Sequence, residues 1–129
     1  KRSYPDEDIK GLTEERARFI YRRDFWTAYC DQLDRLSPAL ALAYFDARVN
    51  SGSVAALLCL KRSVGLERRT AEEALRAIEA HEIEMVVDAF LLQRAFYYAS
   101  CRKAPKYLLG WVNHRLRKLR AVCAEVRRW

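Results

Sequence analysis

Apolar residues recur at helical spacing along this chain of 129 residues, in segments that begin at recognisable helix start signals. Three such signals are Thr13 followed by two glutamates, Ser37-Pro38, and Thr70-x-x-Glu73. A serine or threonine before a helix accepts a hydrogen bond from a free N–H of the first turn, and proline is tolerated at the first helical position. The 4 glycines and 3 prolines are too few for the many turns of a β-sandwich or barrel. We therefore predict an all-α protein.

The spacing, the start signals and the break at Pro105 together predict one compact domain over residues 1–129. It should contain roughly six helices. They are expected at residues 14–26, 38–51, 54–64, 71–80, 83–102 and 106–126. The helix over 54–64 has almost no polar face, so we expect it to be the most buried element. No internal repeat or linker divides the chain.

The net charge of +7 favours an anionic partner. Nucleic acid, an acidic membrane surface and a carboxylate-bearing polymer are all compatible with it, and so is a protein that simply has a positive surface. The densest basic segment runs from Asn113 to Arg120. It predicts either a phosphate-binding surface or a solvated helix face.

The four cysteines, at positions 30, 59, 101 and 123, are widely spaced and only two histidines accompany them. This pattern predicts neither a zinc site nor a disulfide framework, and most of these thiols should be buried as small hydrophobic groups. No apolar segment approaches the roughly 20 residues of a membrane span. We recognise no signal peptide, and we expect no metal and no cofactor.

Aromatic residues are dense in one short stretch, at Phe19, Tyr21, Phe25, Trp26 and Tyr29. Tyr21 and Phe25 share a helix face, whereas Trp26 lies about 140° away from Tyr21 on a helical wheel. These rings cannot all point into one core. Some are core residues, and others could form a cleft wall against the apolar faces of sugar rings.

Asp46 and Asn50 stand four residues apart on an otherwise apolar predicted helix, so they share a face. Unpaired buried polar groups are costly. The pair therefore either makes hydrogen bonds within the fold or lines a cleft. Asp24, next to Arg23, is more typical of a surface ion pair.

Standard catalytic motifs are absent from the sequence, including the phosphate-binding, dinucleotide-binding, zinc-protease and serine-hydrolase signatures. The 17 acidic residues leave a glycosidase-type pair of carboxylates open. Most of them, however, occur in charged helix-surface contexts. Residue chemistry alone therefore indicates no catalytic constellation.

Several motifs occur in a fixed order in the first half of the chain: Lys1-Arg2-Ser3-Tyr4-Pro5, Asp8-Ile9, Leu12-Thr13, Ile20-Tyr21-Arg22-Arg23-Asp24-Phe25-Trp26 and Phe45-Asp46-Ala47-Arg48-Val49-Asn50-Ser51-Gly52. They resemble the glycosyl hydrolase family 108 N-acetylmuramidases, of the phage endolysin or secretion-activator type. In the second half the motifs are Arg94-Ala95-Phe96-Tyr97, Pro105-Lys106-Tyr107 and Gly110-Trp111-Val112-Asn113. They are similar to the predicted peptidoglycan domain that accompanies that family. The resemblance assigns residues 1–65 to the muramidase region and 66–129 to the peptidoglycan domain.

The resemblance implies a lysozyme-like helical fold and hydrolysis of the β-1,4 bond after N-acetylmuramic acid, with peptidoglycan strands as the partner. It implies a cytoplasmic protein released to the periplasm or cell wall, often through a holin. Tyr21, Trp26, Asp46 and Asn50 are the expected wall residues. The family's general acid is the glutamate of an E-G-G-Y motif that precedes a K-x-Y-P segment, and this chain starts at the similar segment Lys1-Arg2-Ser3-Tyr4-Pro5. We therefore expect the glutamate upstream of Lys1, no catalytic residue within the chain, and no activity from the chain alone.

Two features keep other functions open. The segment Leu66-Glu67-Arg68-Arg69-Thr70 lacks the glycines of the D-G-x-x-G-x-x-T turn found in many relatives, so no binding role is assigned to it. The first alternative function is a non-catalytic module that binds peptidoglycan or a secretion partner. The second is a basic helical protein that binds nucleic acid, although no nucleic-acid motif supports it.

Overall fold

The structure, a computed structural model, describes residues 4–127 and is helical throughout its regular elements. The helices are α1 (Glu14–Phe25), α2 (Ala28–Leu36), α3 (Pro38–Ser51), α4 (Ser53–Ser63), α5 (Ala71–Ala80), α6 (Ile83–Ser100), α7 (Ala104–Gly110), the π-helix η1 (Trp111–Leu116) and α8 (Arg117–Arg127). This confirms the predicted all-α class. The motif residues Lys1, Arg2 and Ser3 lie outside the described residues.

The predicted helix starts at Thr13, Ser37 and Thr70 are confirmed. Each of these side chains accepts a hydrogen bond from the backbone N–H three residues further on, at 3.1–3.2 Å. Gly52 separates α3 from α4 at a φ of 88°, a left-handed conformation that side chains other than glycine rarely adopt. The predicted end of α3 is therefore confirmed as well.

Two elements were not predicted. Helix α2 begins after Thr27, whose side chain makes no capping hydrogen bond, and it buries Cys30 and Leu33 completely. Packing rather than a local start signal stabilises this helix, which is why the sequence pattern did not reveal it. The last predicted helix is also wrong in detail, because Pro105 lies in the first turn of α7 and a π-helical segment separates α7 from α8.

Helix α3 is the centre of the core, and the expectation that α4 is the most buried element is wrong. Helix α3 packs against α2, α4, α6 and α8. It contributes six buried residues, whereas α4 contributes four and carries Val54, which is 83% exposed, in its first turn. The apolar character of a helix did not determine its burial, because the position of α4 at the side of α3 leaves one end in solvent.

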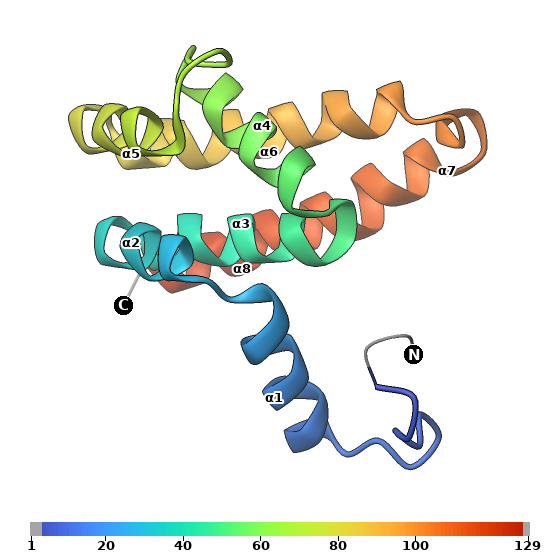
Figure 1. Cartoon of the computed structure of the whole chain (residues 1–129). Coiled ribbons are helices and arrows are strands. Elements are labelled where there is room, and N and C mark those ends of the chain that lie inside the picture. The colour runs from blue at the N-terminus through green and yellow to red at the C-terminus, as the bar shows by residue number, and fades with distance from the viewer. Residues whose placement is uncertain (1–3, 128–129) are drawn as a thin grey trace.

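Figure 1 shows two layers of helices with α1 projecting from one of them. Helices α4 to α7 form one layer, and α2, α3 and α8 form the other. Buried residues from both halves of the chain, 1–65 and 66–129, join in one core cluster. Helix α1 has no buried residue. None of the helices in residues 4–127 is long and apolar enough to cross a membrane.

Candidate functional site

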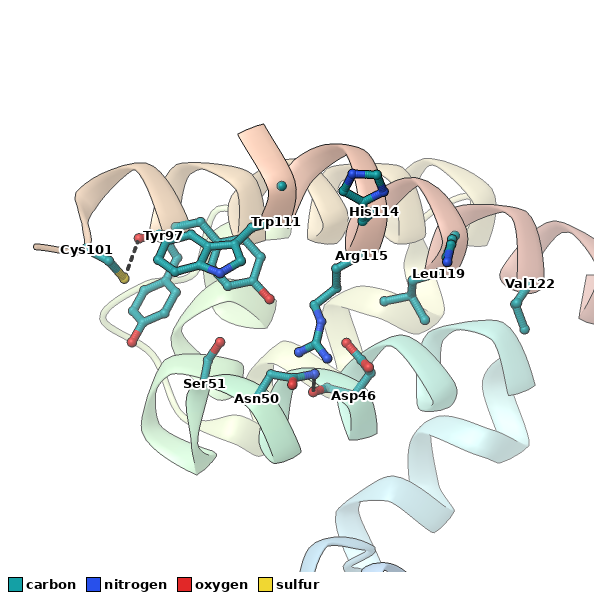
Figure 2. Close-up of a pocket in the computed structure, with 13 residues that line it drawn as sticks. Asp46, Asn50, Ser51, Tyr97, Cys101, Trp111, His114, Arg115, Leu119 and Val122 are labelled. Atoms are coloured by element: carbon teal, nitrogen blue, oxygen red, sulfur yellow. Dashed lines mark hydrogen bonds between the residues drawn. The ribbon is translucent and has the colours of Figure 1, made fainter. Parts of the chain in front are cut away.

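A cleft of about 840 Å³ opens between the C-terminal half of α3 and the helices η1 and α8 (Figure 2). We call it the Asp46 cleft. The residues that line it are Asp46, Asn50, Ser51, Tyr97, Tyr98, Cys101, Gly110, Trp111, His114, Arg115, Lys118, Leu119 and Val122. The first three come from α3, the next three from the end of α6 and its C-cap, and the rest from α7, η1 and α8. The cleft thus brings together residues from both halves of the chain.

Arg94 lies directly behind this cleft and orients two of its lining residues. Only 1% of Arg94 is exposed. Its Nη1 donates a hydrogen bond of 2.6 Å to Oδ2 of Asp46, and its Nη2 donates one of 2.8 Å to the hydroxyl of Tyr98. Because a guanidinium stays charged at any physiological pH, this is a buried cation paired with a carboxylate at the edge of the cleft.

Arg94 belongs to a motif of the family resemblance, but no role for it was predicted from the sequence. A signal for it was present, because Arg94 is the one basic residue in the apolar helix 83–100. Arginine is almost never fully buried without a partner. The pattern therefore indicated a buried pair, although it did not identify Asp46 as the partner.

Asn50 is tied to the same helix turn. Its Nδ2 donates a hydrogen bond of 2.8 Å to the backbone carbonyl of Asp46. Its side-chain oxygen forms no hydrogen bond with any described residue, and Asn50 lines the cleft. Asp46 and Asn50 therefore share a face as predicted. They both make internal hydrogen bonds and line a cleft, so the two expected alternatives occur together.

One end of the Asp46 cleft is aromatic. The rings of Tyr98 and Trp111 lie 5.1 Å apart between centroids, and Tyr107 stacks on Trp111 at 5.8 Å. Tyr97 extends the group, with its ring 6.3 Å from that of Tyr98. Burial raises the pKa of Tyr97 above its usual value, so its hydroxyl stays protonated near neutral pH.

The opposite wall carries positive charge. His114, Arg115 and Lys118 line the cleft, and Figure 2 shows the side chain of Arg115 extending toward Asp46 and Asn50. Arg115 and Lys118 form no ion pair with any residue in the part of the chain that the structure describes. The basic segment 113–120 is thus divided. Arg120 pairs with Asp88 at 3.4 Å outside the cleft, whereas His114, Arg115 and Lys118 line the cleft.

The other two predicted wall residues lie elsewhere. Tyr21 and Trp26 line a separate groove of about 590 Å³ with Phe19, Leu42, Phe45, Arg18 and Arg22. Trp26 packs on Phe45 with ring centroids 5.6 Å apart, and its Nε1 donates a hydrogen bond of 2.7 Å to Asp31. The four predicted residues therefore fall into two separate grooves rather than one cleft wall.

The predicted ion pair at Asp24 is confirmed. Arg23 donates to Oδ1 of Asp24 at 3.2 Å, and the hydroxyl of Tyr4 donates to both carboxylate oxygens at 2.7–2.8 Å. The Tyr4 hydrogen bond, with a further contribution from Arg23, lowers the pKa of Asp24. This contact attaches the N-terminal segment to α1 and belongs to neither groove.

Asp46 is the sole carboxylate among the described residues that line the Asp46 cleft, and Arg94 already pairs with it. Glycoside hydrolysis commonly needs two carboxyl groups at the scissile bond. The arrangement is therefore suited to binding a ligand that has both ring and charged parts. Among residues 4–127, no group of three or more His, Cys, Asp or Glu side chains is placed to hold a metal ion.

Residues 1–52 match the family model of glycosyl hydrolase 108, which confirms the predicted resemblance over this part of the chain. The matched segment ends at Gly52 and so includes α1, α2 and α3, with Asp46 and Asn50 on the last of these helices. No curated protein and no solved structure matched the chain.

Proposed function

We propose that this protein acts on peptidoglycan and binds its glycan strands in the Asp46 cleft. The proposal starts from the match of residues 1–52 to glycosyl hydrolase 108, a family of lysozyme-like peptidoglycan hydrolases. The observation that carries the proposal is the position of α3. Its C-terminal half lies within the family match and also forms one wall of the cleft, through Asp46 and Asn50.

The chemistry of the cleft supports a glycan ligand. The apolar faces of sugar rings pack against aromatic side chains, which Trp111 and Tyr98 supply. Sugar hydroxyls and acetamido groups need donors and acceptors, which Asp46 and Asn50 supply on the facing wall. Ligand sites commonly combine an apolar surface with a few oriented polar groups in this way.

The proposal gives these residues substrate binding and not proton transfer. The family's general acid is the glutamate of the E-G-G-Y motif, and no segment of the 129 residues matches that motif. Asp46 is a poor substitute, because Arg94 already engages its Oδ2 at 2.6 Å and no second carboxylate lines the cleft among the described residues. In a catalytic unit that contains an E-G-G-Y segment, the glutamate of that segment would supply the acid, and α3 with η1 and α8 would hold the strand.

A turbidity assay on purified peptidoglycan sacculi tests the proposal. We would compare this chain, a version that carries the family's E-G-G-Y segment before Lys1, and the same version with the glutamate of that motif changed to glutamine. The expected result is clearing by the second protein alone. Absence of clearing, with helical content confirmed by circular dichroism, would contradict hydrolysis, and clearing by this chain alone would contradict the assignment of the acid.

A second candidate is a peptidoglycan-binding module without catalysis. The single paired carboxylate in the cleft favours it, because binding needs no acid–base pair. The same proteins separate the two functions by co-sedimentation with sacculi. Co-sedimentation without clearing, for the version that carries the E-G-G-Y segment as well, would establish the binding module and exclude the hydrolase.

A further inference from the structure

We infer that the Asp46 cleft selects saccharides that carry a carboxylate, with the sugar ring at Trp111 and the carboxylate at Arg115 and Lys118. The inference rests on the proposed function in one respect, since it takes the ligand to be a peptidoglycan saccharide. It adds a specificity that the family match does not contain, because η1 and α8 lie outside the matched residues.

The charges that line the Asp46 cleft do not balance. The negative charge of Asp46 is compensated from behind by the buried Arg94, at 2.6 Å. Arg115 and Lys118 have no carboxylate partner among the described residues, and both lie on the wall opposite Asp46. The lining is therefore left with an excess of positive charge directed at the ligand. An anionic group on the ligand is the partner that fits it.

An aromatic and a basic residue of the cleft are close together on η1. Trp111 and Arg115 are four residues apart on the π-helix η1. In an α-helix, residues at this spacing are surface neighbours with about 5–6 Å between their Cβ atoms, and the slightly wider π turn of η1 keeps them on the same side. That distance is comparable to the span of one sugar ring with a short acidic substituent. A single ligand unit can therefore contact the ring of Trp111 and the guanidinium of Arg115 together.

The geometry of η1 itself is irregular. Short π-helical segments are rare and occur frequently at functional sites. Here the segment contributes Trp111, His114 and Arg115 to the cleft, all within its six residues. An α-helix turns by about 100° per residue, so the wider π turn changes which side chains share the cleft face. The irregular backbone thus aligns the aromatic and cationic contacts.

Two carboxylates of peptidoglycan share this chemistry. One is the lactyl carboxylate of N-acetylmuramic acid, which is free on strands without peptides. The other belongs to the peptide stem, whose attachment converts the lactyl acid to an amide. Three probes distinguish them: N-acetylglucosamine, which is neutral; N-acetylmuramic acid, with its free lactyl acid; and muramyl dipeptide, whose acid lies on the peptide.

The test is the affinity of this chain for the three probes, measured by ligand-observed NMR at low salt. We expect at least one acidic probe to bind roughly tenfold more tightly than N-acetylglucosamine, the ratio expected for one charge-assisted hydrogen bond. The acidic probe that shows the preference identifies the carboxylate. The preference should decrease as salt is added, because both cations are exposed.

Arg115→Gln and Lys118→Gln test the assigned residues, and Arg117→Gln is the matched control. Arg117 is exposed and close in sequence, but it does not line the cleft. We expect the first two variants to lose most of the preference for the acidic probe while keeping their affinity for N-acetylglucosamine, and the control to retain both. Circular dichroism checks that each variant is folded.

Two results would overturn the inference. One is equal affinity of the unmodified chain for all three probes, or no binding of any of them. The other is an equal loss of preference in Arg115→Gln and Arg117→Gln, which would mean that overall charge and not the cleft attracts the acid. Neither result bears on the clearing of sacculi, which is measured separately. The proposed function can therefore stand when this inference fails.

Discussion

The guanidinium of Arg94 and the carboxylate of Asp46 meet at 2.6 Å although 48 positions separate them in the sequence. The contact joins α6 to α3 in the centre of the domain. It is asymmetric, because 2% of the Arg94 side chain is exposed and 28% of the Asp46 side chain is exposed. The buried Arg94 cation therefore needs Asp46 as its counter-charge, whereas the carboxylate of Asp46 retains access to water and to the cleft.

This asymmetry predicts unequal effects of removing the two partners. Asp46→Ala leaves a buried cation without its counter-charge, which should lower the free energy of unfolding by about 3 kcal/mol. Arg94→Met leaves a carboxylate that water can reach, and should cost about 1–2 kcal/mol. Urea denaturation followed by circular dichroism measures both.

The double variant provides the control for this prediction. With both charges removed, Asp46→Ala with Arg94→Met should be more stable than Asp46→Ala alone, since no unpaired charge remains. The prediction is contradicted if the two single variants lose equal free energy of unfolding. It is also contradicted if the loss in the double variant equals the sum of the two single losses.

The helix caps predict a local effect on stability. Ser37 accepts a hydrogen bond from the backbone N–H of Leu40 at 3.2 Å, whereas Thr27 makes no side-chain capping bond to α2. Ser37→Ala should therefore lower the free energy of unfolding by about 1 kcal/mol. Thr27→Ala is the matched control and should have a distinctly smaller effect. Equal effects of the two substitutions in thermal denaturation would contradict the assignment of the cap.

The cysteines should differ in reactivity. Cys30, Cys59 and Cys123 are buried, and burial raises the pKa of the Cys59 thiol, which keeps it protonated and unreactive. Cys101 is partly exposed at the rim of the cleft. An aromatic disulfide reagent should therefore modify one thiol rapidly in the native protein, and Cys101→Ser should remove that fast phase. A fast phase that persists in this variant would be inconsistent with the structure.

The contact between Tyr4 and Asp24 predicts a pH dependence. The Tyr4 hydrogen bond lowers the pKa of Asp24 in the folded protein. A carboxyl group with a lowered pKa stabilises the fold above its unfolded pKa, about 3.9, and this stabilisation is lost as the pH falls through the folded pKa. Tyr4→Phe should therefore lower the melting temperature near neutral pH, and the difference from the unmodified chain should disappear in acid.

The measurement for this prediction is thermal denaturation of both proteins at a series of pH values. Tyr21→Phe is the control, since the hydroxyl of Tyr21 makes no hydrogen bond to any described residue. A difference between Tyr4→Phe and the unmodified chain that is constant with pH would mean that the hydroxyl acts through packing and not through the ionised carboxylate of Asp24.

Local sequence signals determined the all-α class and the starts of three helices at Thr13, Ser37 and Thr70, because a capping bond joins residues only three positions apart. The family match likewise depended on the order of residues 1–52 alone. Helix α2 could not be predicted in this way, because it lacks a capping bond and is stabilised by the burial of Cys30 and Leu33.

The candidate site was decided by tertiary structure. Sequence reasoning identified Asp46 and Asn50 as unusual polar residues, but it grouped them with Tyr21 and Trp26, which lie in another groove. It could not pair Asp46 with Arg94 or place Trp111 and Arg115 opposite α3, because these contacts join residues that are dozens of positions apart. Helical periodicity specifies which residues share a face of one helix, whereas only the packing of α3 against α6 and α8 determines which faces meet and enclose a cleft.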